Sequence, residues 1–233
     1  MTNFKALDLY AKVEDLLGVK EVAPKLYAHY FLTLNTLEFD SFLDVGCGSG
    51  DFLRQIKSAF HPEKLLGIDL SPQMVAMTQE QGIDAKSINL CLVEEKFDVI
   101  TAVFDMLNYL DTTQLSSFLS CIEEHLNDGG YFLCDVNTLF GFEEVAVGAV
   151  SIDDDDRFVA IESDFSDGVY VSDFTLFEKE QECYKKSKET IEQYYYSVET
   201  LRSRLENMQL MNQDSVALYF DEADKVFLVF QKI

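Results

Sequence analysis

The sequence of 233 residues is long enough for one domain with an insertion, and too short for two large independent domains. Its hydrophobic content of 48%, with only three prolines, is typical of a compact globular protein and excludes a disordered chain. The formal net charge of −24 disfavours DNA, RNA and anionic membrane surfaces as partners, because like charges repel. We therefore expect no nucleic acid and no membrane as partners. Independently of the charge, we expect a monomer or homodimer.

Apolar spacing predicts the first elements in chain order. A period near 3.6 predicts helices over residues 4–17 and 20–38. From residue 41, short apolar runs alternate with amphipathic stretches. This pattern predicts strands at 41–46, 64–69, 84–88, 97–104 and 129–136, with helices at 51–60, 71–81 and 111–126. The alternating order predicts an α/β fold with a mostly parallel sheet and helices on both faces.

Past residue 147 the pattern changes to aromatic strands, predicted at 157–165, 169–178 and 183–195. Asp167-Gly168 lies between the first two and is a strong hairpin signal. A helix at 197–208 and strands near 214–220 and 225–231 return the chain to the main sheet. We therefore expect N-terminal helices over 1–40 that cap the site, an α/β domain over 41–146 and 197–233, and a small antiparallel β lid over 147–196.

The cysteines and the beginning of the sequence indicate the cytoplasm. Residues 1–8 mix charged and apolar side chains, without the hydrophobic region of a signal peptide, and no segment reaches the length of a membrane span. The five cysteines are scattered and form no CxxC pair, so we expect reduced core thiols. The acidic run at 153–156 lacks the spaced ligands of a calcium loop, which favours a solvated turn and no metal site.

The segment from Asp44 to Gly50 carries the strongest functional signal. It joins an apolar strand to a helix through a D-x-G-x-G-x-G turn, in which alternate glycines let the backbone approach a ligand closely and adopt positive φ. Asp69 ends the next strand, where a carboxylate can accept both hydroxyls of a ribose. A dinucleotide site would need G-x-G-x-x-G, which counted from Gly46 puts a glycine at Asp51. The spacing therefore disfavours a nicotinamide oxidoreductase.

The stretch from Asp44 to Gly50 resembles the first motif of the class I S-adenosylmethionine-dependent methyltransferases, and residues 67–74 resemble the second. Residues 97–100 and 125–132 resemble the family's fourth strand and its passage into the fifth. The insertion and residues 104–110 are similar to small-molecule members with a β-sheet lid after strand five. The resemblance implies a Rossmann-like sheet of seven strands and S-adenosylmethionine as cofactor, with S-adenosylhomocysteine as product. It also implies in-line methyl transfer to N or O of a small acceptor.

The resemblance also assigns residues to the cofactor. It implies that Gly46, Gly48 and Gly50 contact the methionine portion through their backbone, that Asp44 braces this loop near the amino group, and that Asp69 holds the ribose. Asn89 aligns with an aspartate that in many members accepts a hydrogen bond from the adenine amino group. Further residues expected at the cofactor are Tyr10, Leu70, Met74, Leu90 and Phe104.

Candidates for the acceptor chemistry follow the ends of strands four and five, where open α/β sheets bind ligands. We expect catalytic roles for Asp105 and Asn108, with helix capping as the alternative, and consider Asp135 and Asn137 as well. Tyr195 ends the lid and could face the acceptor or fill the lid's own core. A general base is needed only if the acceptor arrives protonated, and the negative charge favours a neutral or basic acceptor such as an amine. A cofactor-binding regulatory or assembly protein without chemistry is the alternative function.

Overall fold

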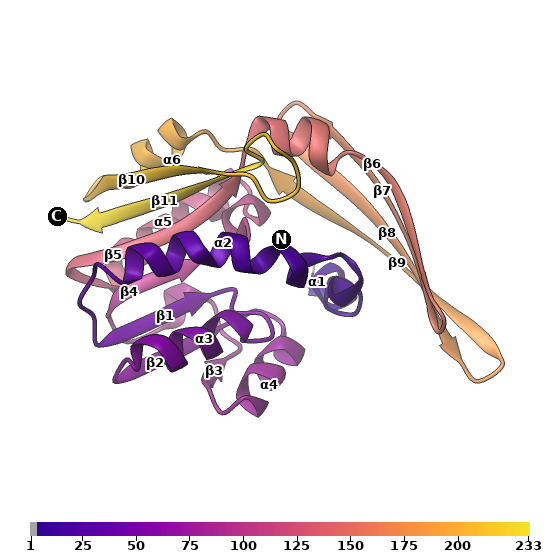
Figure 1. The fold of residues 1–233 in the computed structure, drawn as a ribbon, viewed down its shortest axis with the longest axis horizontal. Helices are drawn as coiled ribbons and strands as arrows, with labels where there is room; N and C mark the ends of the chain where they lie inside the picture. Colours follow the sequence, from indigo (N-terminus) through magenta and orange to yellow (C-terminus); the bar gives the residue numbers. More distant parts are fainter. Residues whose placement is uncertain (1–3) are drawn as a thin grey trace.

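The computed structural model describes residues 4–233, so the first three residues of the expected N-terminal segment lie outside it. The main sheet has seven strands in the order β10-β11-β5-β4-β1-β2-β3 (Figure 1). Strand β11 runs antiparallel to β5 and β10, and the other neighbouring pairs are parallel. The predicted fold class is confirmed. The strands are β1 (Ser41–Val45), β2 (Lys64–Ile68), β3 (Asp84–Lys86), β4 (Phe97–Ala102), β5 (Leu126–Asn137), β10 (Met208–Val216) and β11 (Lys225–Lys232).

Helices cover both faces of this sheet. On one face α2 (Val19–Leu34) and α3 (Asp51–Phe60) bury their apolar sides against strand residues such as Phe42 and Phe227. On the other face α5 (Thr112–His125) and α6 (Val198–Arg204) bury theirs against residues such as Phe132 and Phe230. Helix α4 (Pro72–Glu80) connects β2 to β3. No helix within residues 4–233 is long and apolar enough to cross a membrane.

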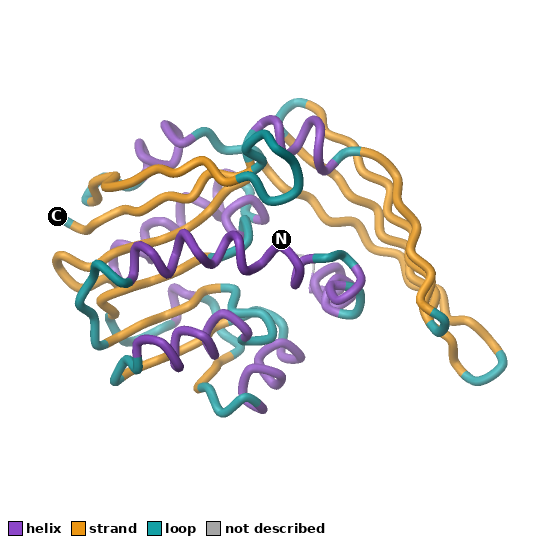
Figure 2. Tube along the Cα trace, in the orientation of Figure 1, coloured by secondary structure: helices purple, strands orange, loops and turns teal. Residues whose placement is uncertain are grey.

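A separate antiparallel sheet is inserted after β5, and Figure 2 shows its long strands extending away from the main sheet. It consists of β6 (Gly148–Asp154), β7 (Arg157–Ser166), β8 (Val169–Glu180) and β9 (Cys183–Tyr194). The predicted hairpin is present: Asp167 and Gly168 have φ of 52° and 78°, as a two-residue turn between β7 and β8 requires. The expectation of three strands was wrong, because the structure adds a fourth, the exposed edge strand β6. The acidic run at 153–156 begins in β6, and its last two residues form the turn into β7.

The N-terminal segment is more broken than predicted. Instead of one helix over 4–17, the chain forms α1 (Phe4–Ala11) and the 3₁₀ turn η1 (Glu14–Leu16). Gly18, with a φ of 70°, precedes α2, which ends four residues before the predicted limit of 38. The break lets this segment dock on the second sheet. Lys12 Nζ lies 2.8 Å from Glu178, and the Arg157 guanidinium donates to both Asp15 oxygens. Ala6 and Leu9 of α1 share a buried cluster with side chains of β7, β8 and β9.

Two of the five cysteines form a disulfide, which corrects the expectation of five reduced core thiols. Cys91 lies on the 3₁₀ turn η2 (Leu90–Leu92) and Cys121 on α5, with their Cα atoms 5.3 Å apart. Packing of η2 against α5 brings them together, and this contact leaves no local signal in the sequence. Cys47 and Cys134 are free and buried, whereas Cys183 is exposed on β9.

The final strand pair also differs from prediction, because β10 begins six residues before position 214.

Candidate functional site

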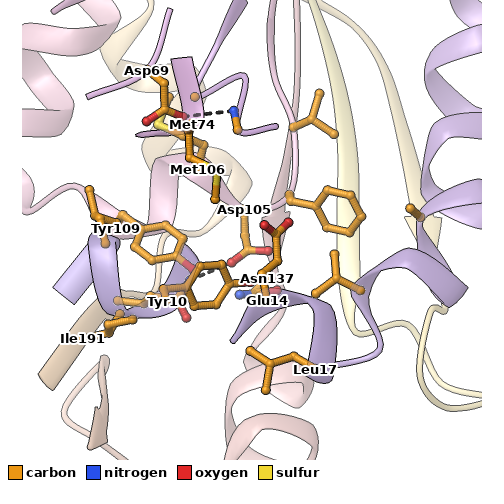
Figure 3. A pocket seen from close by; sticks show the side chains of 18 of the residues that line it. Tyr10, Glu14, Leu17, Asp69, Met74, Asp105, Met106, Tyr109, Asn137 and Ile191 are labelled. Carbon is orange, nitrogen blue, oxygen red and sulfur yellow. Dashed lines mark hydrogen bonds between the residues drawn. The ribbon is translucent and has the colours of Figure 1, made fainter. Parts of the chain in front are cut away.

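A cavity of about 850 Å³ lies where β1, β2 and β4 of the main sheet end, and the N-terminal segment and the second sheet enclose its other side (Figure 3). Its lining runs from the loop after β1 to inward residues of β7, β8 and β9. The volume is near the upper end of the roughly 300–1,000 Å³ typical of ligand pockets. One continuous space therefore connects the glycine-rich loop to the second sheet.

The glycine-rich loop after β1 is tightly shaped. Gly46, Gly48 and Gly50 have φ of 77°, 54° and 85°, a region that residues with side chains rarely adopt. A Cβ added at Gly46 would lie 2.9 Å from the Met106 side chain, and one at Gly50 would lie 2.8 Å from Thr78 Oγ1. Gly46 and Gly48 line the cavity, whereas Gly50 faces α4 and does not. The loop thus presents bare backbone to the cavity, as a closely bound ligand requires.

Asp69 meets this loop at the end of β2. Its carboxylate accepts hydrogen bonds from the Gly48 N–H at 3.0 Å and from the Ser71 N–H at 2.8 Å, one on each oxygen. Burial raises the pKa of Asp69, and the two N–H donors only partly offset this effect. Each oxygen keeps a second lone pair, and the side chain lines the cavity. The carboxylate can therefore accept both hydroxyls of a sugar beside the loop.

Asp44 lies beneath the loop at 2% exposure and accepts a 2.7 Å hydrogen bond from Thr101 Oγ1. Burial raises the pKa of Asp44 to about 7, although the Thr101 hydroxyl acts in the opposite direction. Asp44 also lines the cavity. A cationic group bound here would favour the ionised carboxylate.

Most of the residues expected at the cofactor line this cavity. Asn89 is exposed, and its side chain caps the start of η2, because Oδ1 accepts a hydrogen bond from the Cys91 N–H at 2.9 Å. The amide oxygen retains a lone pair for an amino group of a ligand. The others that line the cavity are Tyr10, Leu70, Met74, Leu90 and Phe104.

The chain after β4 is held in an uncommon conformation by a buried carboxylate. Phe104 and Asp105 have φ of 57° and 49°, and Asp135 on β5 accepts both of their N–H groups at 2.8 Å. Asp135 is fully buried and also accepts the Tyr30 hydroxyl at 2.7 Å. Burial raises the pKa of Asp135, while the charge of Lys225 lowers it. This network fixes Asp105 at the wall of the cavity.

Lys225, at the start of β11, was missed in the sequence. It is 3% exposed, donates to Asp105 Oδ1 and, at 2.7 Å, to Asn137 Oδ1, and lies 3.6 Å from Asp135. Burial acts to lower the pKa of Lys225, but the charges of Asp105 and Asp135 raise it overall. The other oxygen of Asp105 accepts from Gln193 of β9 at 2.6 Å. Both oxygens of Asp105 are thus engaged by protein donors.

Asn108 and Tyr195, two of the three catalytic candidates, lie outside the cavity lining. Asn108, on the 3₁₀ turn η3 (Met106–Tyr109), is fully buried; its Nδ2 donates to the Tyr194 carbonyl at 2.7 Å, and its Oδ1 accepts the Asn137 N–H at 3.0 Å. Tyr195 follows the end of β9, and its N–H donates to the Gly168 carbonyl. The Asn108 side chain therefore holds the backbone at Tyr194 and Asn137 in place. Sequence reasoning also missed Glu14 of η1, whose half-buried side chain lines the cavity.

Comparisons with known proteins point to methyltransferases. Residues 42–130 match the family model of a methyltransferase domain. The chain is 26% identical over 208 residues to a putative methyltransferase, YqeM, of Bacillus subtilis (strain 168), covering 82% of this chain and 83% of that one. It is 30% identical over 100 residues, 41% of each chain, to dTDP-3-amino-3,4,6-trideoxy-alpha-D-glucopyranose N,N-dimethyltransferase of Streptomyces venezuelae.

The fold has a solved counterpart. An S-adenosylmethionine-dependent methyltransferase from Clostridium acetobutylicum ATCC 824 superimposes with a TM-score of 0.76, at 22% identity and 98% coverage of both chains. The matched domain contains the glycine-rich loop and Asp69, which together shape one end of the cavity. Residues 42–130 therefore form a methyltransferase domain, and the whole chain has the fold of an S-adenosylmethionine-dependent methyltransferase, which supports an enzyme with S-adenosylmethionine as its cofactor.

Proposed function

We propose that the enzyme transfers the methyl group to N or O of a small organic acceptor, enclosed between the main sheet, the N-terminal helices and the second sheet. The observation that carries this proposal is the continuity of the cavity, which is lined at one end by Gly48 and Asp69 and at the other by Ser172 and Phe174 of β8. An acceptor seated against the second sheet faces the cofactor end without a wall between them. The second sheet then acts as a lid.

The same geometry supports the division into domains that we expect from the sequence. In this proposal the N-terminal segment up to residue 40 caps the site, residues 41–146 and 197–233 bind the cofactor, and residues 147–196 form the lid. The ion pairs of Lys12 and Arg157 link the cap to the lid, so both enclose the acceptor together. The absence of nucleic-acid partners, the monomeric or homodimeric state and the cytoplasmic location stay proposals. The Cys91–Cys121 disulfide does not support the cytoplasmic location, since reducing compartments keep most thiols free.

The residues that would hold the cofactor divide by its parts. The backbone of Gly46 and Gly48 and the carboxylate of Asp44 suit the methionine portion, Asp69 the ribose, and Asn89 the adenine edge. When bound, S-adenosylmethionine supplies an electrophilic methyl group on a sulfonium. The protein's contribution is then to hold the acceptor in line and to exclude water, which supplies most of the rate for such a displacement.

An amine nitrogen is the favoured acceptor. Acidic side chains outnumber basic ones in the cavity lining, six against three, so the site favours cations. The relative from Streptomyces venezuelae is named for N,N-dimethylation of an amino-sugar nucleotide. The acidic residues are Glu14, Asp44, Asp51, Asp69, Asp105 and Asp224, and the basic residues are Lys20, Arg54 and Lys225.

Calorimetry with S-adenosylhomocysteine and methylation assays test the proposal. The wild-type protein is expected to bind S-adenosylhomocysteine, Asp69→Ala to lose that binding, and exposed Asp164→Ala on β7 to keep it. Radiolabelled S-adenosylmethionine should then methylate members of a panel of small amines and alcohols. No binding by the wild-type protein, or labelling of proteins and RNA but of no small molecule in a cell extract, would contradict the proposal.

A further inference from the structure

The end of the cavity beneath the second sheet brings two carboxylates and several aromatic rings together. Figure 3 shows Glu14, Asp105, Tyr10 and Tyr109 gathered in one region of the cavity. Burial, together with the charges of Glu14 and Asp105, raises the pKa of both Tyr10 and Tyr109, as expected when these four groups are close neighbours. Tyr170 and Tyr219 also line the cavity, and their charges add to the rise in the pKa of Tyr10, which places them near it. Rings and carboxylates are the groups that bind an organic ammonium.

The two carboxylates differ in what they can offer a ligand. Asp105 gives one oxygen to Lys225 and the other to Gln193, so its charge is largely neutralised. The Glu14 carboxylate has no hydrogen bond or ion pair to any residue from 4 to 233 in this structure. Burial raises the pKa of Glu14, while Lys20 opposes the rise and Asp51, Asp15 and Asp69 add to it. Glu14 therefore has its oxygens free for a cationic group.

The local chain fixes the direction of Glu14. Its neighbour Asp15 is exposed and tied to Arg157 of β7, with N–O distances of 2.8 and 2.9 Å. Arg157 also donates to the Lys12 carbonyl at 2.7 Å, which clamps η1 to the second sheet from both sides of Glu14. With Asp15 held outward, the preceding side chain lies along the cavity wall.

We infer that the acceptor is recognised as a protonated aliphatic amine, with Glu14 as its contact carboxylate and the rings of Tyr10, Tyr109, Tyr170 and Tyr219 as an aromatic cage. This inference rests on the proposed function and specifies its substrate class. Glu14 can also take the ammonium proton, which leaves nitrogen the lone pair that attack on a methyl carbon requires. The proton then resides on a Glu14 oxygen, and the nitrogen is neutral before transfer.

A pair of probes of equal shape and different charge tests the inference without turnover. tert-Butylammonium and tert-butanol are titrated into protein saturated with S-adenosylhomocysteine at pH 7, and tyrosine emission is followed because the chain has no tryptophan. The wild type is expected to bind the ammonium about 10-fold to 100-fold more tightly than the alcohol, the range for a charge-assisted hydrogen bond. Glu14→Gln should remove most of this preference.

Glu21→Gln is the matched control, because Glu21 is exposed on α2 and loses the same charge outside the cavity lining. It should keep the preference for the ammonium. Equal affinity for both probes, no saturable ammonium binding, or the same loss in both variants would overturn the inference. S-Adenosylhomocysteine binding is measured first in all three proteins. Its absence from the wild type would contradict the proposed function, whereas intact binding with a Glu14-independent result would refute only the inference.

Discussion

Replacing Lys225 by methionine removes a buried ammonium but keeps an unbranched side chain of similar length. Lys225 is 3% exposed and Asp135 is fully buried, so water cannot replace the lost charge. Removing one partner of a buried ion pair typically costs about 3–5 kcal/mol. Asp135 keeps three donors, the Tyr30 hydroxyl and the N–H groups of Phe104 and Asp105. We therefore expect a loss near the lower limit, about 3 kcal/mol in the free energy of unfolding at neutral pH.

Urea unfolding at pH 5.5 and pH 8 measures this loss. Burial raises the pKa of Asp135 and Lys225 lowers it, so the pKa rises further in Lys225→Met. A carboxyl whose folded-state pKa exceeds its unfolded-state value loses stability as pH rises between the two values. The loss should therefore be larger at pH 8 than at pH 5.5, and adding Asp105→Asn should recover part of it. A loss below about 1 kcal/mol at pH 8, or an equal loss at both pH values, would refute this reasoning.

Three further predictions concern the glycine-rich loop, the carboxylate beneath it and the disulfide. Because burial raises the pKa of Asp44 to about 7, the free protein should lose stability as pH rises toward 7, and a cationic ligand should bind more tightly with rising pH. Calorimetry with S-adenosylmethionine from pH 5.5 to 8 should show this rise, and Asp44→Asn should abolish it; an equal rise in the variant would count against it. Gly50→Ala places a Cβ 2.8 Å from Thr78 Oγ1 at a φ of 85°, so the loop must shift. Binding of S-adenosylhomocysteine should therefore weaken at least 10-fold, which is about 1.4 kcal/mol, and an unchanged affinity would contradict this argument. Cys91→Ser removes a disulfide with a sequence separation of 30, so the free energy of unfolding should fall by about 3–4 kcal/mol. If the urea midpoint of the wild type does not change with reductant, the disulfide does not stabilise the fold.

The end of the cavity that the glycine-rich loop and Asp69 shape was predictable because its parts are close in sequence. The loop from Asp44 to Gly50 needs positive φ, and only residues without side chains fit beside Met106 and Thr78. Parallel pairing of β1 with β2 then places Asp69 next to Gly48, which alternation of strands and helices already implied. Helix α3 was predicted with its observed limits, because its apolar period and the glycine before it give two independent signals.

The end of the cavity beneath the second sheet was not predictable because it is assembled from distant segments. Lys225 and Asp105 are 120 residues apart, and an isolated lysine at the start of a strand gives no signal that it will be buried. Glu14 was hidden within a helix predicted over 4–17, since the apolar spacing does not show the break before η1. Tyr195 and Asn108 failed to reach the cavity for a related reason. The direction of the Tyr195 side chain depends on where β9 ends, and that of Asn108 depends on how η3 packs. The local sequence pattern determines neither the end of β9 nor the packing of η3.

The acidic lining of the cavity also bears on the order of events in a catalytic cycle. S-Adenosylmethionine carries a sulfonium charge that its product lacks, because the leaving group is a neutral thioether. With the cofactor bound as proposed, the carboxylates of Glu14, Asp44 and Asp69 in this partly buried space would stabilise the charged donor more than the neutral product. Coulomb interactions strengthen as water is excluded. A protonated acceptor adds a second positive charge, which these carboxylates also compensate. Losing the sulfonium charge during transfer removes part of that attraction, so the same field that gathers both reactants favours release of S-adenosylhomocysteine.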